Sequence, residues 1–131
     1  MTGSYVLILT LQRPATIRVG ALGEVVFEAG AYAYVGSAMG GLQARIDRHL
    51  RGQKRMHWHI DYLLADAQVI DVVRVESHER LECRIASALA AQLRGVPGFG
   101  CSDCACDSHL FFGESPASLR ERIAAAVRAC S

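Results

Sequence analysis

The sequence predicts a mixed α/β domain, of the α+β class, in which helices flank an antiparallel sheet. Residues 4–11 (SYVLILTL) are rich in β-branched and aromatic side chains and contain no helix breaker, which is typical of a largely buried strand. Two short apolar runs, 16–19 and 24–28, are joined by a connection that contains glycine, and they predict an antiparallel hairpin. Helical periodicity begins only after this first third of the chain.

A strand and a helix are expected on either side of a glycine-rich turn. In residues 31–36 (AYAYVG), Tyr32 and Tyr34 fall on one face of the strand, and alanine and valine fall on the other. After the turn, apolar residues recur at intervals of four, which predicts an amphipathic helix that ends at Gly52. These residues are Leu42, Ile46 and Leu50.

The rest of the chain alternates helices and strands. The expected elements are a turn and short helix within 57–67, a strand over 69–76, a helix from a Ser77 cap to Arg94 and Gly95, an edge strand over 110–113, and a helix over about 116–129. All of them belong to one expected domain, residues 1–131, which includes a cysteine-rich loop at 98–110 and the C-terminal helix.

Composition narrows the class of protein. The chain has 131 residues, of which 51% are hydrophobic and 21% charged, so it is long enough to bury a core and unlike a disordered segment. No apolar run approaches the roughly 18 residues that span a bilayer, and no signal peptide is evident, so we expect a cytoplasmic protein with no membrane partner. The five cysteines are an odd number, and we expect them to be reduced.

A basic patch lies on a chain whose net charge is only +1. Residues 45–55 carry five cationic side chains and one acid. Within this patch, Arg45 and His49 are four residues apart and share a helix face, to one side of which lies Arg48. A guanidinium can hold a phosphate through two hydrogen bonds, and an imidazole or phenol can move a proton. The pattern therefore indicates a phosphate site, although a solvated helix face explains the charges equally well.

A family resemblance rests on this spacing. Tyr34-Val35-Gly36, followed by Arg45 and then His49, resembles the second half of the motif of the GIY-YIG nuclease superfamily. Gly3-Ser4-Tyr5 would then be the first triplet, separated from the second by the hairpin. One subgroup of this superfamily is similar over most of the chain. It shares the motifs GxYxYVGSA, RxxRH, HWHxDYL and CSDCxCxSHLF.

The resemblance implies a metal-dependent DNA endonuclease or nickase, built on a three-stranded antiparallel sheet and acting in DNA repair or processing. Its substrate would be structured, branched or damaged DNA, and a repair protein is a possible partner. One divalent ion, Mg²⁺ or Mn²⁺, would be held by Glu82, with Glu79 as the alternative ligand. Tyr5 and Tyr34 would position or deprotonate the attacking water, Arg45 would stabilise negative charge, and His49 would assist proton transfer.

Further residues are expected to contact the substrate. His57 and His59 flank Trp58 directly after the basic patch, where they either bind substrate or brace the end of the basic helix. The full set of expected substrate-binding residues is Gly36, Ser37, Arg48, Lys54, His57 and His59.

Cysteines crowd into a short segment near the end of the chain. Cys101, Cys104, Cys106 and His109 offer four soft ligands within nine residues, which favours Zn²⁺. Reduced cysteines in a tight loop and a redox-sensitive disulfide are the alternatives. The remaining cysteines, Cys83 and Cys130, are expected to pack on helices. Two rival functions follow: a nucleic-acid-binding module without catalysis, and a zinc- or redox-dependent regulator.

Overall fold

The computed structural model describes residues 1–52, 54–101 and 104–130. In chain order the elements are β1 (Gly3–Leu11), β2 (Ala15–Arg18), the 3₁₀ turn η1 (Gly20–Leu22), β3 (Glu24–Phe27), β4 (Gly30–Ala38), α1 (Leu42–Leu50), α2 (His59–Leu64), β5 (Gln68–Glu76), α3 (Glu82–Ala90), β6 (Arg94–Gly95), β7 (Leu110–Gly113) and α4 (Pro116–Cys130). Five strands form one antiparallel sheet in the order β5-β1-β4-β7-β6, and β2 and β3 form a separate hairpin. The expected α+β class and the inserted hairpin are confirmed.

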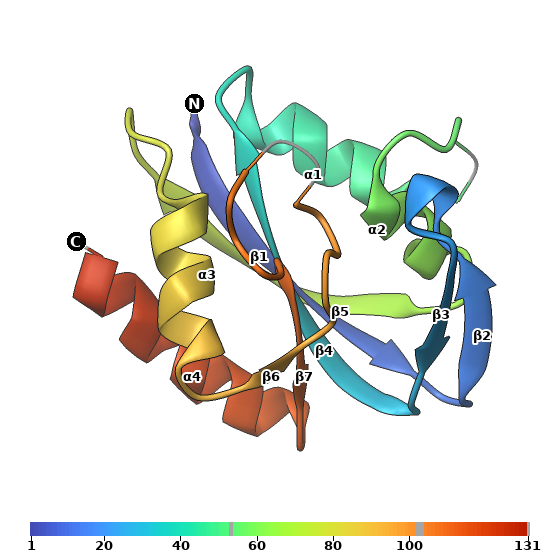
Figure 1. Ribbon diagram of the computed structural model, residues 1–131. Helices are drawn as coiled ribbons and strands as arrows, with labels where there is room; N and C mark the ends of the chain where they lie inside the picture. Colours follow the sequence, from blue (N-terminus) through green and yellow to red (C-terminus); the bar gives the residue numbers. More distant parts are fainter. Residues whose placement is uncertain (53, 102–103, 131) are drawn as a thin grey trace.

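Helices cover both faces of the five-stranded sheet (Figure 1). On one face α3 and α4 pack against side chains such as Val6 and Ile8 of β1. On the other face α1, α2 and the hairpin pack around Tyr5, Leu7 and Tyr34. β1 lies between the two layers and is buried almost throughout, as expected for residues 4–11. The tyrosines therefore lie on the sheet face that is covered by α1, the helix that carries most of the basic patch.

The sheet has five strands rather than the three expected from the resemblance. The extra strands are β7, which pairs with β4, and β6, which pairs with the far side of β7. Residues 110–113 were expected at the sheet edge, but they lie one strand inside it. Phe111 and Phe112 bury apolar surface on opposite faces of the sheet, so β7 is stabilised as an interior strand with backbone partners on both sides.

The buried side of α1 differs from the expected stripe. Leu42 and Ile46 are buried as expected, but Leu50 is 55% exposed and His49 takes the third buried position. Because an α-helix has 3.6 residues per turn, position 49 lies almost directly in line with Leu42 along the helix, whereas position 50 is turned away from that line. This places the His49 ring against the sheet.

The helix expected from Ser77 to Arg94 is shorter at both ends. The Ser77 hydroxyl accepts a hydrogen bond from the Glu79 amide in a turn, and the α-helix begins five residues after Ser77. At the other end, Arg94 pairs with β7 as a strand residue. In the part of the chain that the structure describes, no helix combines the length and apolar character that a membrane span requires.

Candidate functional site: a polar pocket beside a cysteine–histidine cluster

A polar pocket of about 290 Å³ lies beside the paired strands β1 and β4 and the start of α3. Its lining includes Tyr5 from β1, Tyr34 from β4, Arg45 from α1 and Glu82 from α3. Thus four of the five residues expected to be catalytic, which come from four separate elements, meet at one cavity. A larger cavity of about 830 Å³, beside α3 and the segment 105–108, contains none of them.

The two tyrosines lie on neighbouring strands with their ring centroids 6.5 Å apart. Tyr5 pairs directly with Gly36 of β4, and a Cβ atom at that glycine would overlap the Tyr5 ring. Burial raises the pKa of Tyr5 to about 12, although the nearby Arg45 guanidinium lowers it. Burial also raises the pKa of Tyr34 well above its ordinary value. Both phenols therefore hold their protons at neutral pH.

His49 contacts Tyr5 but does not itself line the pocket. Its Nε2 lies 2.6 Å from the Tyr5 hydroxyl oxygen, and its Nδ1 has no hydrogen-bond partner among the described residues. Burial is the main cause that lowers the pKa of His49 to about 4, opposed by the negative charge of Asp61. The imidazole is therefore neutral at pH 7. Depending on its tautomer, its Nε2 either donates a hydrogen bond to the Tyr5 oxygen or accepts one from the Tyr5 hydroxyl.

Arg45 is held at the pocket by its own contacts. One guanidinium nitrogen donates to the Ser37 carbonyl oxygen at 2.8 Å, and the guanidinium lies 4.3 Å from the centre of the Trp58 ring. Arg48 also lies over Trp58, and it forms a two-pronged hydrogen bond with the buried Asp61 carboxylate at 2.8 and 3.0 Å. Arg45 is thus placed to meet a ligand, whereas Arg48 is engaged by the protein.

Glu82 supplies the carboxylate among the described residues that line the pocket. Its side chain is 20% exposed, with Arg80 Nη1 at 4.0 Å and His109 Nδ1 at 3.8 Å. The alternative, Glu79, is 70% exposed, faces Arg84 and does not line this pocket. A carboxylate beside open polar space is one ligand that a divalent ion could use, because Mg²⁺ keeps several waters and commonly takes only one or two carboxylates. The Ser37 hydroxyl oxygen is buried and has no hydrogen-bond partner among the described residues.

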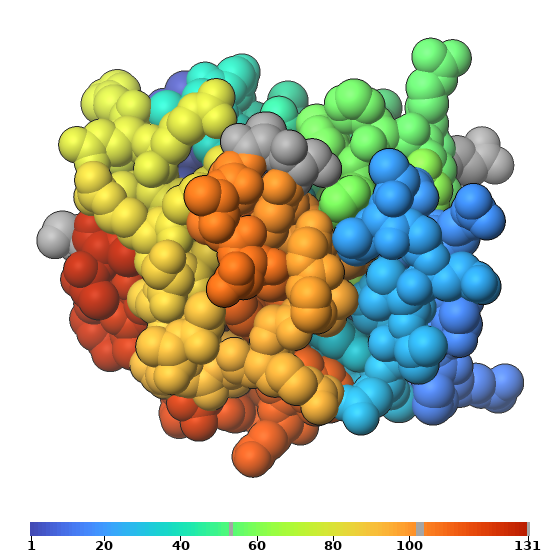
Figure 2. Space-filling view, in the orientation of Figure 1, coloured from blue at the N-terminus to red at the C-terminus, as the bar shows by residue number. Residues whose placement is uncertain are grey.

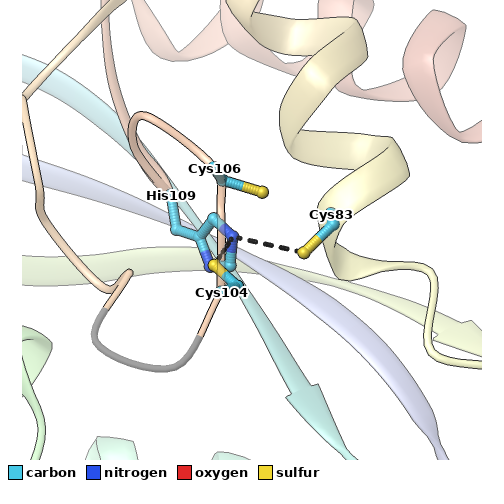
Figure 3. A group of neighbouring side chains, drawn as sticks. All are labelled: Cys83, Cys104, Cys106 and His109. Atoms are coloured by element: carbon cyan, nitrogen blue, oxygen red, sulfur yellow. Dashed lines mark hydrogen bonds between the residues drawn. The ribbon is translucent and has the colours of Figure 1, made fainter.

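A second group of side chains lies at the start of α3 (Figure 3). Cys83 from α3 meets Cys104, Cys106 and His109 from the cysteine-rich segment, and their ligand atoms all lie within 4.8 Å of one another. Figure 2 shows this segment, in orange, at the surface between α3 in yellow and the hairpin in blue. Three thiols and an imidazole in this arrangement could hold a metal ion.

Comparison with protein families gives one match. A family model described as "Domain of unknown function DUF123" covers residues 4–131. The chain belongs to the DUF123 family. Comparisons with curated proteins and with solved structures found no significant match.

The expected zinc ligands of this DUF123 chain need one correction. Cys104, Cys106 and His109 belong to the cluster, but the fourth member is Cys83 and not Cys101. The Cys101 thiol instead donates to the Phe99 carbonyl oxygen at 3.4 Å. Cys83 was expected to be a packing residue, because nothing local in the sequence shows that α3 runs beside the cysteine-rich segment.

The expected substrate contacts have different places in the DUF123 fold. Gly36 and Ser37 line the pocket. The Lys54 ammonium instead donates to backbone carbonyls at the end of α1, at 2.8 Å to Arg51 and 2.9 Å to His49. The ring of the exposed His57 packs against Trp58, and His59 Nδ1 accepts a hydrogen bond from the Gly100 amide at 2.8 Å. Lys54 and His59 therefore brace the structure.

Sequence reasoning missed several residues of the pocket, two of which have aromatic or charged side chains. Trp58 and Arg80 both line the pocket beside Arg45 and Glu82. The signal available for Trp58 was a tryptophan between two histidines just after a basic patch, a pattern typical of nucleic-acid surfaces. Arg80 had no such signal, because it lies among alternating charges in the turn before α3.

Proposed function

We propose that the protein is a metal-dependent endonuclease or nickase that hydrolyses phosphodiester bonds of structured DNA, in repair or processing. The observation that carries this proposal is the convergence of Tyr5, Tyr34, Arg45 and Glu82 on one polar pocket. These are four of the residues that the GIY-YIG resemblance assigns to catalysis. The fold adds support, since the strands that carry the two tyrosines are direct neighbours.

The chemistry is an attack by water on phosphorus that breaks the P–O bond to one sugar. In net terms the water gives its oxygen to phosphorus and one proton to the leaving sugar oxygen, so the products are a phosphate monoester and a sugar hydroxyl. The Tyr5 phenol keeps its proton at neutral pH, so it orients the water rather than deprotonating it. In the tautomer with an unprotonated Nε2, His49 accepts the hydrogen bond of this phenol and leaves the oxygen lone pairs directed to the pocket. The His49 contact therefore sets the direction of the attacking water.

Arg45 and Glu82 act on charge. The transition state gathers negative charge on the phosphoryl oxygens, and a guanidinium already held by Ser37 and Trp58 meets that charge with little reorganisation. Glu82 would hold the divalent ion, which when bound supplies charge neutralisation and acidifies a coordinated water. Arg80, 67% exposed at the same rim, would attract the DNA backbone.

The test is cleavage of nicked, branched and single-stranded DNA in Mg²⁺ or Mn²⁺ by the purified chain. We expect cutting, and we expect Arg45→Ala and Glu82→Ala each to slow it by about 100-fold or more, with unchanged circular dichroism. Glu79→Ala is the matched control, because it removes an exposed carboxylate three residues away that does not line the pocket, and it should cut as the wild type does.

Two outcomes would contradict the proposal. One is wild-type protein that cuts none of these substrates with either ion. The other is cutting that survives both pocket variants at the wild-type rate. Tight DNA binding without cutting would instead support the rival function, a binding module of the same fold.

A further inference from the structure

The cysteine–histidine cluster has the dimensions of a tetrahedral metal site. His109 Nε2 lies 3.6 Å from Cys104 Sγ and 3.9 Å from Cys83 Sγ. A tetrahedral Zn²⁺, with Zn–S of about 2.3 Å and Zn–N of about 2.0 Å, requires roughly 3.5 Å between a sulfur and a nitrogen ligand. The side chains therefore stand close to the separations that coordination demands.

The ligand atoms, and the two chain segments that supply them, favour zinc over other metals. Three thiols with one imidazole form a soft donor set, which suits Zn²⁺ and does not suit Mg²⁺ or Mn²⁺. Structural zinc sites usually take ligands from two separate segments of the chain, and Cys83 supplies the second segment here. A ligand set confined to residues 101–109 would require that loop to turn back sharply on itself.

We propose that the chain binds one structural Zn²⁺ through Cys83, Cys104, Cys106 and His109, and that this ion joins the cysteine-rich segment to the first turn of α3. The four protein ligands close the coordination sphere, so the ion acts as a cross-link between segments rather than as a second catalytic centre.

The same site positions Glu82, a step that rests on the proposed function. With Nε2 on the metal, the proton of the His109 ring is on Nδ1, which faces a Glu82 carboxylate oxygen at 3.8 Å. This separation is longer than a hydrogen bond, and a closing of about 1 Å on metal binding would form the bond through which carboxylates orient metal-bound histidines and strengthen metal binding. Glu82 also precedes the ligand Cys83 in the chain, so the zinc site holds the pocket carboxylate both through the backbone and through His109. Glu82 is therefore a positioning residue for the zinc site as well as a pocket residue.

The first experiment measures metal content by elemental analysis in full-length protein purified without chelator. We expect about one zinc per chain. Cys83→Ser and Cys104→Ser should each lower the zinc content several-fold, whereas Cys101→Ser and Cys130→Ser, which alter the matched loop and helix cysteines, should keep it. Wild-type protein without zinc, or zinc lost in Cys101→Ser but kept in Cys83→Ser, would overturn the ligand set.

Cobalt gives a readout that does not depend on the stability of the variants. Co²⁺ bound to the zinc-free wild-type chain should produce the intense visible absorption of a tetrahedral thiolate site. A weak octahedral spectrum, or a disulfide between any two of Cys83, Cys104 and Cys106 found by mass spectrometry of freshly purified protein, would count against the site.

The link to Glu82 is tested through zinc affinity. In competition with a chromophoric chelator, Glu82→Ala should weaken zinc binding by about 10- to 100-fold, and Glu79→Ala should leave it unchanged. Equal affinity in wild type and Glu82→Ala would overturn the link while leaving the zinc site standing. None of these measurements uses DNA, so failure of the zinc site and failure of the nuclease proposal are distinguished.

Discussion

At the scale of single residues, the candidate pocket depends on the absence of a side chain at Gly36. This glycine faces Tyr5 across the β1–β4 pair, and the Tyr5 ring lies over its Cα. Tyr5 is only 1% exposed, and a Cβ atom at position 36 would lie within 2.8 Å of its ring, so the ring would have to shift. Gly36 therefore sets the position of the Tyr5 hydroxyl and, through it, of the bond to His49.

Gly36→Ala should displace the Tyr5 ring and break its 2.6 Å contact with His49. We expect about a 100-fold loss of cleavage, and a loss of stability of about 1–3 kcal/mol because a buried polar group loses its partner. The measurements are the rate of DNA cleavage and urea unfolding.

Gly40→Ala is the matched control for this prediction. Gly40 lies in the turn that follows β4 and also lines the pocket, but a Cβ atom there meets nothing within 4 Å. This variant should keep both stability and activity. Equal activity in Gly36→Ala and Gly40→Ala would show that the Tyr5 position is not needed.

At the scale of elements, Asp61 joins the basic helix to α2. Its carboxylate accepts two hydrogen bonds from Arg48 of α1 and one each from the backbone amides of His57 and Trp58 at the start of α2. These contacts keep the pKa of Asp61 below its ordinary value although burial raises it. Arg48 and Asp61 also hold Trp58 in place, since Arg48 packs on the Trp58 ring and Asp61 accepts from its backbone amide. Arg45 lies over the same ring.

Asp61→Ala should lower the free energy of unfolding by about 3 kcal/mol, because it leaves the Arg48 charge without its partner and removes the cap of α2. Urea unfolding at pH 7 measures this loss. The comparison variant is Asp71→Ala, which breaks the exposed pair with Arg120 and should cost no more than about 1 kcal/mol. Similar losses in both variants would contradict a special role for Asp61.

The elements also show how far local patterns reach. Strands β1, β4 and β5, the hairpin and the short helix α2 could all be predicted, because alternation and turn residues are properties of neighbouring positions. The start of α3 could not, since Ser77 offers a cap that the chain uses for a turn. The strand character of Arg94 and Gly95 depends on β7, which lies about fifteen residues later and pairs with them.

At the scale of the whole molecule, burial of a neutral histidine makes folding depend on pH. His49 is 2% exposed and is surrounded by Arg45, Arg48, Lys54 and Asp61. Its pKa is about 4 in the folded protein, against an ordinary value of 6.5. Between these two values the unfolded chain binds the proton and the folded chain does not, so stability falls as the pH falls from 6.5 towards 4.

The difference between the folded and unfolded pKa of His49 predicts that its protonation lowers the free energy of unfolding by about 3 kcal/mol between pH 7 and pH 4. His49→Gln removes the titrating group and keeps an amide that can hydrogen-bond to Tyr5. Its urea-unfolding free energy should therefore decline less steeply over this range than that of the wild type. Parallel pH profiles for the two proteins would contradict the prediction.

The sequence by itself determined the strand faces, the inserted hairpin and the spacing that brings Tyr34, Arg45 and His49 to one region, because each follows from the period of a strand or a helix. Only the tertiary structure showed that Glu82 rather than Glu79 lines the pocket, and that Cys83 rather than Cys101 lies in the cysteine–histidine cluster. These choices depend on where α3 begins and what it packs against. Contacts between distant segments depend on how side chains are buried across the whole sheet. They produce no repeating pattern among neighbouring residues, so the sequence alone does not reveal them.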